Sequence, residues 1–247
     1  MDIPAKFRSK MGVYDIQING DKIKATRGGA SLEPGVTPKK ILDSPLKATL
    51  VNQEHMIENV ISELKSLVDS NSPIVGVDFK RSELSKKRMH MHLLLLYVKD
   101  HCFVIQLDQI NHFPKNLGNF LGDKSICFVG FKIDDNFDQL RHSLEQKSSS
   151  SSFVSADDDE SSTTCLTGDG AEIRMLAASV LKKPSLTKCC DPAQLAREIG
   201  FEMEKPDETT VQPSYWGALC FSEEEMKYAL RDVYICYHIG KRMLGML

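Results

Sequence analysis

Three short stretches of this sequence carry side chains whose types and spacing could support chemistry together. Asp78 is the lone acid in one apolar stretch, and Asp134 and Asp135 come shortly after a second. Tyr228 and Asp232 lie four residues apart, a spacing that places both side chains on one face of a helix. Carboxylate oxygens are ligands that Mg²⁺ takes in proteins. A cation site would therefore form if the fold brought the three stretches together.

Each stretch also has an ordinary structural interpretation. A lone acid at the end of a strand is commonly a turn or cap residue, and an acidic pair before a helix commonly caps free backbone N–H groups. A tyrosine and an aspartate on one helix commonly form a partly exposed face. Taken singly, each stretch favours this ordinary interpretation. Their order and their strand, strand and helix contexts favour a shared site.

Hydrophobic periodicity predicts the elements that must position these side chains. Asn19-Gly20 between two short apolar runs predicts an N-terminal β-hairpin over 12–27. Apolar runs and apolar residues at helical spacing predict the rest. The predicted strands cover 46–51, 74–79, 89–98, 102–107 and 126–131, and the predicted helices cover 54–70, 114–121, 134–146, 171–181, 191–200 and about 222–244. This alternation is typical of an α/β fold.

Composition limits the class of protein. The chain has 247 residues, with 31 Lys+Arg against 34 Asp+Glu, a net charge of −3 and 41% hydrophobic residues. That is enough to bury a core, and the charge argues against a chain-wide polycation. No apolar run approaches the roughly 20 residues that a membrane helix needs. The seven cysteines form no CxxC pair, which indicates reduced thiols in an intracellular protein of the nucleus, the cytoplasm or both, with no membrane partner.

The sequence predicts one domain over 11–247, preceded by a flexible N-terminus at 1–10. The Gly- and Pro-rich segment 28–45 is expected to be a loop. Segment 147–168 holds five consecutive serines and the acidic run 157–160. Such a segment buries almost nothing, so we expect a disordered insertion there.

Together, the three stretches resemble the DEDD superfamily of 3′-5′ exonucleases in its tyrosine-containing branch, most of all Werner-like domains and ribonuclease D. The family pattern is Asp-x-Glu, then Val-Gly-x-x-Ile-x-x-Asp, then Tyr-x-x-x-Asp. These motifs fall on 78–80, 129–136 and 228–232, and the segments around Arg174 and Trp216 also look familial. The resemblance implies a ribonuclease-H-like fold, a mixed sheet flanked by helices.

The resemblance also implies a mechanism. In the family, the acids hold two Mg²⁺ or Mn²⁺ ions that clamp the attacking and leaving oxygens, and the tyrosine orients the attacking water. Carried over, Asp78, Tyr228 and Asp232 would be catalytic, and Asp78 and Asp232 would bind metal. The substrate would be the 3′ end of single-stranded RNA or DNA.

Two of the four family acids are replaced here. Lys80 stands at the glutamate position, and Asn136 stands at the aspartate of the second motif. Each unit charge near 4 Å is worth about 4 kcal/mol at an effective dielectric of ~20, so a second cation should not bind. Lys80 would instead occupy a metal position and hold Asp78 and Asp232 in a salt-bridged cluster. Asp135 is the candidate stand-in for the lost aspartate.

These residues leave three functional hypotheses. The preferred one is an exonuclease-family protein that binds single-stranded nucleic acid with weakened or lost metal-dependent activity, a pseudoenzyme. Lys86, Lys87 and Arg88, in a predicted basic hairpin, would contact backbone phosphates. The alternatives are an active exonuclease, and a non-catalytic subunit that forms homo- or hetero-oligomers with exonuclease-like relatives.

Overall fold

A computed structural model describes most of the chain after residue 45. The described residues are 14–19, 22–26, 46–85, 88–110, 113–150, 170–201, 216–217, 221 and 223–246. The predicted flexible terminus 1–10 and the predicted loop 28–45 lie outside them, as does the predicted insertion from residue 151 onward.

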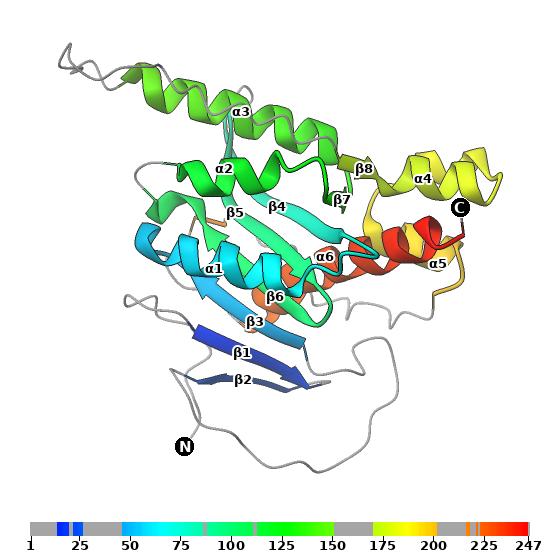
Figure 1. The fold of residues 1–247 in the computed structure, drawn as a ribbon. Coiled ribbons are helices and arrows are strands. Elements are labelled where there is room, and N and C mark those ends of the chain that lie inside the picture. The colour runs from blue at the N-terminus through cyan, green and yellow to red at the C-terminus, as the bar shows by residue number, and fades with distance from the viewer. Residues whose placement is uncertain are drawn as a thin grey trace.

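A mixed eight-stranded sheet forms the centre of the molecule (Figure 1), in the order β2-β1-β3-β6-β5-β4-β7-β8. The pairs β3–β6, β4–β7 and β7–β8 are parallel, and the others are antiparallel. The predicted N-terminal hairpin is confirmed as β1 and β2. The strands are β1 Tyr14–Asn19, β2 Lys22–Thr26, β3 Leu46–Val51, β4 Ile74–Ser85, β5 Arg88–Val98, β6 His101–Gln106, β7 Cys127–Gly130 and β8 Gly170–Glu172.

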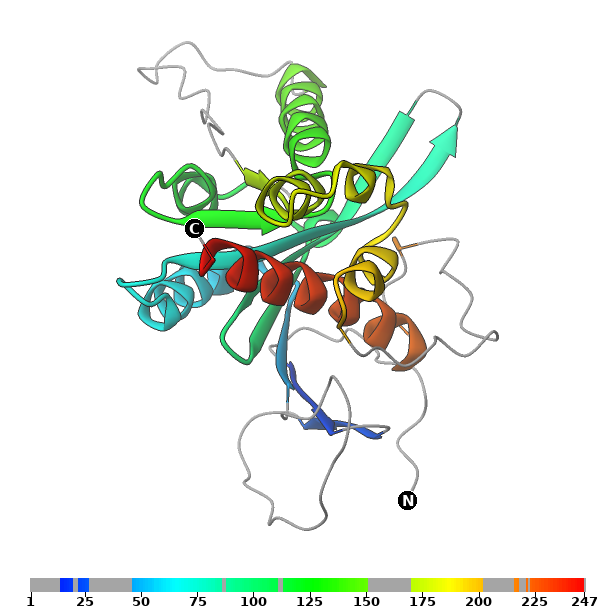
Figure 2. The same ribbon diagram turned by 90° about the vertical axis from the view of Figure 1, so that its right-hand side faces the viewer.

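Helices cover both faces of this sheet (Figure 2). They enclose two hydrophobic clusters. One cluster packs α1, α2 and α3 against one face, and the other packs α4, α5 and α6 against the opposite face. The helices are α1 Glu54–Leu67, α2 Lys115–Leu121, α3 Ile133–Ser150, α4 Ile173–Val180, α5 Pro192–Glu198 and α6 Glu223–Leu244, with 3₁₀ turns η1 Leu107–Gln109 and η2 Pro184–Lys188. The arrangement confirms the predicted α/β class and the mixed sheet flanked by helices. No helix among the described residues is long and apolar enough to cross a membrane.

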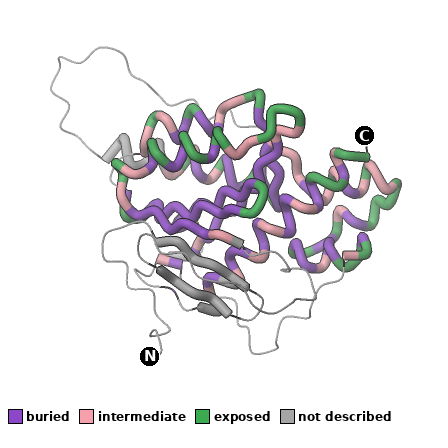
Figure 3. Tube along the Cα trace, turned by 60° about the horizontal axis from the view of Figure 1, so that its bottom comes forward, coloured by how far each residue is buried: buried purple, intermediate pink, exposed green. Residues whose placement is uncertain are grey.

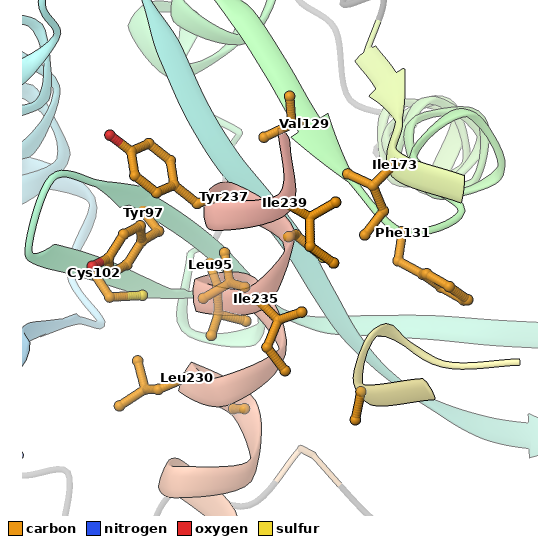
Figure 4. Close-up of a cluster of buried hydrophobic side chains, with 14 of the residues drawn as sticks. Leu95, Tyr97, Cys102, Val129, Phe131, Ile173, Leu230, Ile235, Tyr237 and Ile239 are labelled. Carbon is orange, nitrogen blue, oxygen red and sulfur yellow. The ribbon is translucent and has the colours of Figure 1, made fainter. Parts of the chain in front are cut away.

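Strand alternation divides β4 between the two clusters. Val77 and Phe79 belong to the cluster under α1–α3, whereas Gly76 faces α6. Residues 74–80 of β4, 91–98 of β5 and 101–106 of β6 are buried, and exposed residues lie on the outer helices and turns (Figure 3). Figure 4 shows the α6 side, where Leu230, Ile235 and Tyr237 pack among buried side chains of the sheet.

Two glycines allow α6 to lie close to the sheet. A Cβ atom added to Gly76 would stand 2.9 Å from the Cβ of Tyr237 and 3.1 Å from the carbonyl oxygen of Val233. A Cβ atom on Gly240 would stand 2.8 Å from Val129. Contacts this short require the absence of a side chain, so these glycines set how near α6 comes to β4 and β7.

Three boundaries differ from the sequence-based expectation. Strand β4 continues past Phe79 to Ser85, because polar residues in a long hairpin still complete the backbone ladder with β5. Helix α3 continues to Ser150, past the predicted helix end at 146. No Gly or Pro interrupts that stretch. Strand β8 was not predicted, because three residues are too few for a periodic pattern.

Candidate functional site

The centre of the candidate site is a group of three charges from β4 and α6. Asp78 and Lys80 are two apart on β4 and therefore share its α6-facing side. The Nζ atom of Lys80 lies 2.7 Å from Oδ2 of Asp78 and 2.6 Å from Oδ2 of Asp232. The prediction that Lys80 holds the two carboxylates together is confirmed.

All three side chains in this group are buried. The exposed fractions are 11% for Asp78, 8% for Lys80 and 10% for Asp232. Burial raises the pKa of Asp78 above its usual 3.8. The positive charge of Lys80 opposes this shift, and the negative charge of Asp232 adds to it. Burial alone would lower the pKa of Lys80, but the two carboxylates outweigh burial and raise it above its usual 10.5. Lys80 is thus a fixed cation at neutral pH.

Two aromatic rings lie beside the Lys80 ammonium. Its Nζ atom is 5.1 Å from the ring centre of Tyr228 and 5.7 Å from that of Trp216, both within cation–π range. The backbone N–H of Trp216 donates to Oγ of Ser82, which places the indole beside β4. Tyr228 is half-buried, and burial raises the pKa of its hydroxyl. The ammonium therefore contacts carboxylates and also faces aromatic rings.

Arg231 adds a second cation on α6. Its guanidinium lies 5.1 Å from the ring centre of Tyr228, and Nη2 lies 3.7 Å from Oδ1 of Asp232. The side chain is 20% exposed. Arg231 is thus partly accessible at the margin of the buried charges.

Asn136 lies in a separate environment on the α3 side. It is 5% exposed, and its Nδ2 donates to the carbonyl oxygen of Phe131 at 3.2 Å. Nη1 of Arg81 donates to Oδ1 of Asn136 at 3.3 Å and to Oε1 of Gln139 at 2.7 Å. Arg81 follows Lys80 directly on β4, so alternation points these neighbouring cations to opposite faces.

The remaining predicted site residues are not brought into the central group. Asp135 is exposed on the first turn of α3, and none of its described contacts reaches Asp78 or Asp232. Its role as a stand-in stays a prediction. Lys86 and Lys87 lie outside the described residues, and Arg88 is described only as the backbone start of β5.

The donor set does not fit two divalent cations. The described residues contain no group of three or more His, Cys, Asp or Glu side chains arranged to hold a metal. Asp78 and Asp232 already share an ammonium, and Asn136 already accepts from a guanidinium. A cation entering this centre would have to displace Lys80 and overcome its positive charge.

Sequence reasoning missed some of the residues that complete this site. Arg81 was not singled out as the partner of Asn136, although its place next to Lys80 on the same strand was a usable signal. Trp216 was noted only as part of the family likeness, and its contact with Lys80 depends on tertiary structure. Arg231 stands between Tyr228 and Asp232 in the motif but carried no predicted role.

Comparisons with known proteins agree with the resemblance seen in the motifs. No family model matches the chain. A curated protein of Acanthamoeba polyphaga mimivirus, named as a candidate 3′-5′ exonuclease, is 23% identical over 188 residues, which cover 74% of this chain and 41% of the relative. The chain thus spans well under half the length of that relative.

Solved structures of exonucleases share the fold. RNase D of Escherichia coli matches with a TM-score of 0.55 at 14% identity, over 80% of this chain and 44% of that one. The exonuclease domain of Nibbler from Aedes aegypti matches with a TM-score of 0.55 at 14% identity, over 79% of this chain and 88% of that one. The predicted ribonuclease-H-like exonuclease fold is confirmed.

Proposed function

We propose that this chain, which resembles 3′-5′ exonucleases in its motifs and shares their fold, binds single-stranded nucleic acid without performing two-metal hydrolysis. One observation carries the proposal: the Lys80 ammonium lies 2.7 and 2.6 Å from Asp78 and Asp232, the two carboxylates that remain at family metal positions. The hydrolysis of the family depends on Mg²⁺ or Mn²⁺ ions, and a fixed ammonium opposes their entry.

The margin of the site supports retained binding. Tyr228 is half-buried and Arg231 is partly exposed, and the guanidinium of Arg231 lies 5.1 Å from the ring centre of Tyr228. A guanidinium donates to phosphate oxygens in a planar fork, and an aromatic ring stacks on a base. Lys86, Lys87 and Arg88 would extend this contact along the strand.

The first experiment measures, in parallel, the binding of single-stranded nucleic acid and its shortening. The purified chain is incubated with 5′-labelled single-stranded RNA or DNA, with Mg²⁺ or Mn²⁺. We expect binding with no shortening from the 3′ end. Shortening that disappears in Tyr228→Phe, but persists in Tyr234→Phe on the same helix, would establish an active exonuclease and refute the proposal. Absence of binding to either strand would refute it in favour of a protein-interaction subunit.

A matched pair of variants tests the binding margin. Arg231→Gln removes the guanidinium that lies on Tyr228, and Arg197→Gln removes an exposed guanidinium on α5. Because a hydrogen bond to a charged group is worth about 1.5–3 kcal/mol, we expect Arg231→Gln to weaken strand binding about tenfold or more. Arg197→Gln should leave the Kd nearly unchanged. Equal effects would show that the strand does not use this margin.

A further inference from the structure

We infer that β4 and α6 form a preformed cage for an ammonium ion, and that in the native chain Lys80 fills this cage with its own side chain. The inference concerns what occupies the site, so it holds whether or not the chain binds nucleic acid. Lys80 then acts as a tethered cation that blocks the entry of any other.

The walls of the cage match the chemistry of an ammonium group. Oδ2 of Asp78 and Oδ2 of Asp232 form ion pairs with the ammonium of Lys80 at 2.7 and 2.6 Å. The rings of Tyr228 and Trp216 stand 5.1 and 5.7 Å away. Carboxylates serve any cation, but aromatic faces favour ammonium ions over strongly hydrated Mg²⁺.

The cage walls are held by contacts other than Lys80. The close approach at Gly76 keeps α6 against β4, which keeps Asp232 near Asp78. The bond from the backbone of Trp216 to Ser82 holds the indole in place. Among the described residues, Arg231 also lies near the cage, with its Nη2 atom 3.7 Å from Oδ1 of Asp232. Removing the Lys80 side chain would therefore leave two carboxylates and two rings around an uncompensated space.

Lys80→Ala creates a defined vacancy. The atoms removed from Lys80 beyond Cβ correspond to propylammonium, so this ion is the probe. At ten times its Kd, a ligand raises the Tm of a chain of this size by about 3–6 °C. We expect propylammonium to do so in Lys80→Ala. The control is propanol, a neutral molecule of similar shape, with KCl at the same concentration. It should raise the Tm of Lys80→Ala by no more than about 1 °C.

Two further proteins serve as controls. In the native chain, and in Lys80→Met, whose side chain fills the same space, propylammonium should leave the Tm unchanged. The native Tm should also be the same in Mn²⁺ and in a chelator. If Lys80→Ala is unfolded without added amine, its refolding yield in propylammonium against propanol replaces the Tm.

The outcomes separate this inference from the proposed function, because no nucleic acid is present. Stabilisation or refolding by propylammonium, confined to Lys80→Ala, supports the cage. Equal effects of propylammonium and propanol would overturn it. Stronger stabilisation of Lys80→Ala by Mn²⁺ than by propylammonium would also overturn it, since the space would then be a metal site.

Discussion

Lys80 and Asn136 stand where the exonuclease pattern that this chain resembles has acids, and the two side chains make different contacts. Lys80 is a buried cation that binds the carboxylates of Asp78 and Asp232. Asn136 is a neutral amide of nearly the same shape as an aspartate, and it donates to a backbone carbonyl and accepts from Arg81. Relative to that pattern, Lys80 reverses the local charge, whereas Asn136 removes one charge.

This difference shows that the absence of a metal-binding carboxylate and the occupation of a metal position are separate properties. The amide of Asn136 lacks the charge of a carboxylate, but it brings no positive charge that would oppose a cation. Lys80 also lacks a carboxylate, and its ammonium supplies the positive charge that a metal would bring. The α6 side of β4 should therefore be far more sensitive to substitution than the α3 side.

Lys80→Met should be the most damaging of these changes. It leaves Asp78 and Asp232 buried together without a cation, and breaking a buried pair in this way costs about 3–5 kcal/mol. Urea unfolding at pH 7 measures the loss. Lys115→Met, an exposed change on α2, is the matched control and should stay within about 0.5 kcal/mol. A loss for Lys80→Met as small as the control's would show that the cluster adds no stability.

The advantage of native Lys80 should also disappear in alkali. The pKa of Lys80 in the folded chain lies above its usual 10.5, so the folded state holds this proton more tightly than the unfolded state does. The resulting stability is fully present below pH 10.5 and is lost as the pH rises through the folded-state value. The difference between the native chain and Lys80→Met, measured at pH 8, 10 and 11, should shrink only at the top of this range. A stability difference that does not depend on pH would show that side-chain packing, rather than the charge of Lys80, stabilises the native chain.

Gly76→Ala should disturb the α6 side through geometry alone. Its Cβ would stand 2.9 Å from Tyr237, and overpacking of this kind costs about 1–3 kcal/mol. Urea unfolding gives the loss, and Gly245→Ala, at the end of the chain beyond α6, is the control. If Gly76→Ala is as stable as the control, α6 is free to shift away from β4.

Asn136→Asp should have the smallest effect. A carboxylate there would pair with Arg81, and a partly exposed pair contributes about 0–1 kcal/mol. We expect stability within about 1 kcal/mol of native, and no strand cleavage with Mg²⁺ or Mn²⁺. Asn119→Asp on α2 is the exposed control. Cleavage by Asn136→Asp alone would mean that Lys80 does not block the site.

The sequence predicted the centre of the site better than its surroundings. The resemblance to the exonuclease motifs predicted that Asp78, Lys80 and Asp232 lie together. Local rules placed only Asp78 and Lys80 on one side of a strand, and Tyr228 and Asp232 on one face of a helix. The capping residue of α5 was also predictable, since Asp191 accepts from the backbone of Gln194.

Contacts between distant segments could not be predicted in the same way. The contact of the Trp216 ring with Lys80 depends on how the segment before α6 lies against β4, and the pairing of Arg81 with Asn136 depends on how α3 packs against β4. No periodicity in the sequence indicates either contact. The three-residue β8 joins the sheet edge through its neighbours rather than through its own pattern. These contacts decide the chemistry of the site as much as the motifs do.

Because the Lys80 cluster is buried, its ion pairs should respond little to ionic strength. Mobile ions screen exposed charges over about 8–10 Å at physiological salt, but they screen buried pairs much less. Binding of a strand to exposed cations releases counterions and therefore weakens steeply as salt rises. In a salt titration, the buried Lys80 cluster and the exposed cations of this chain should therefore respond differently. Concentrated salt should release a bound nucleic acid, whereas the ion pairs of Lys80 with Asp78 and Asp232 should persist.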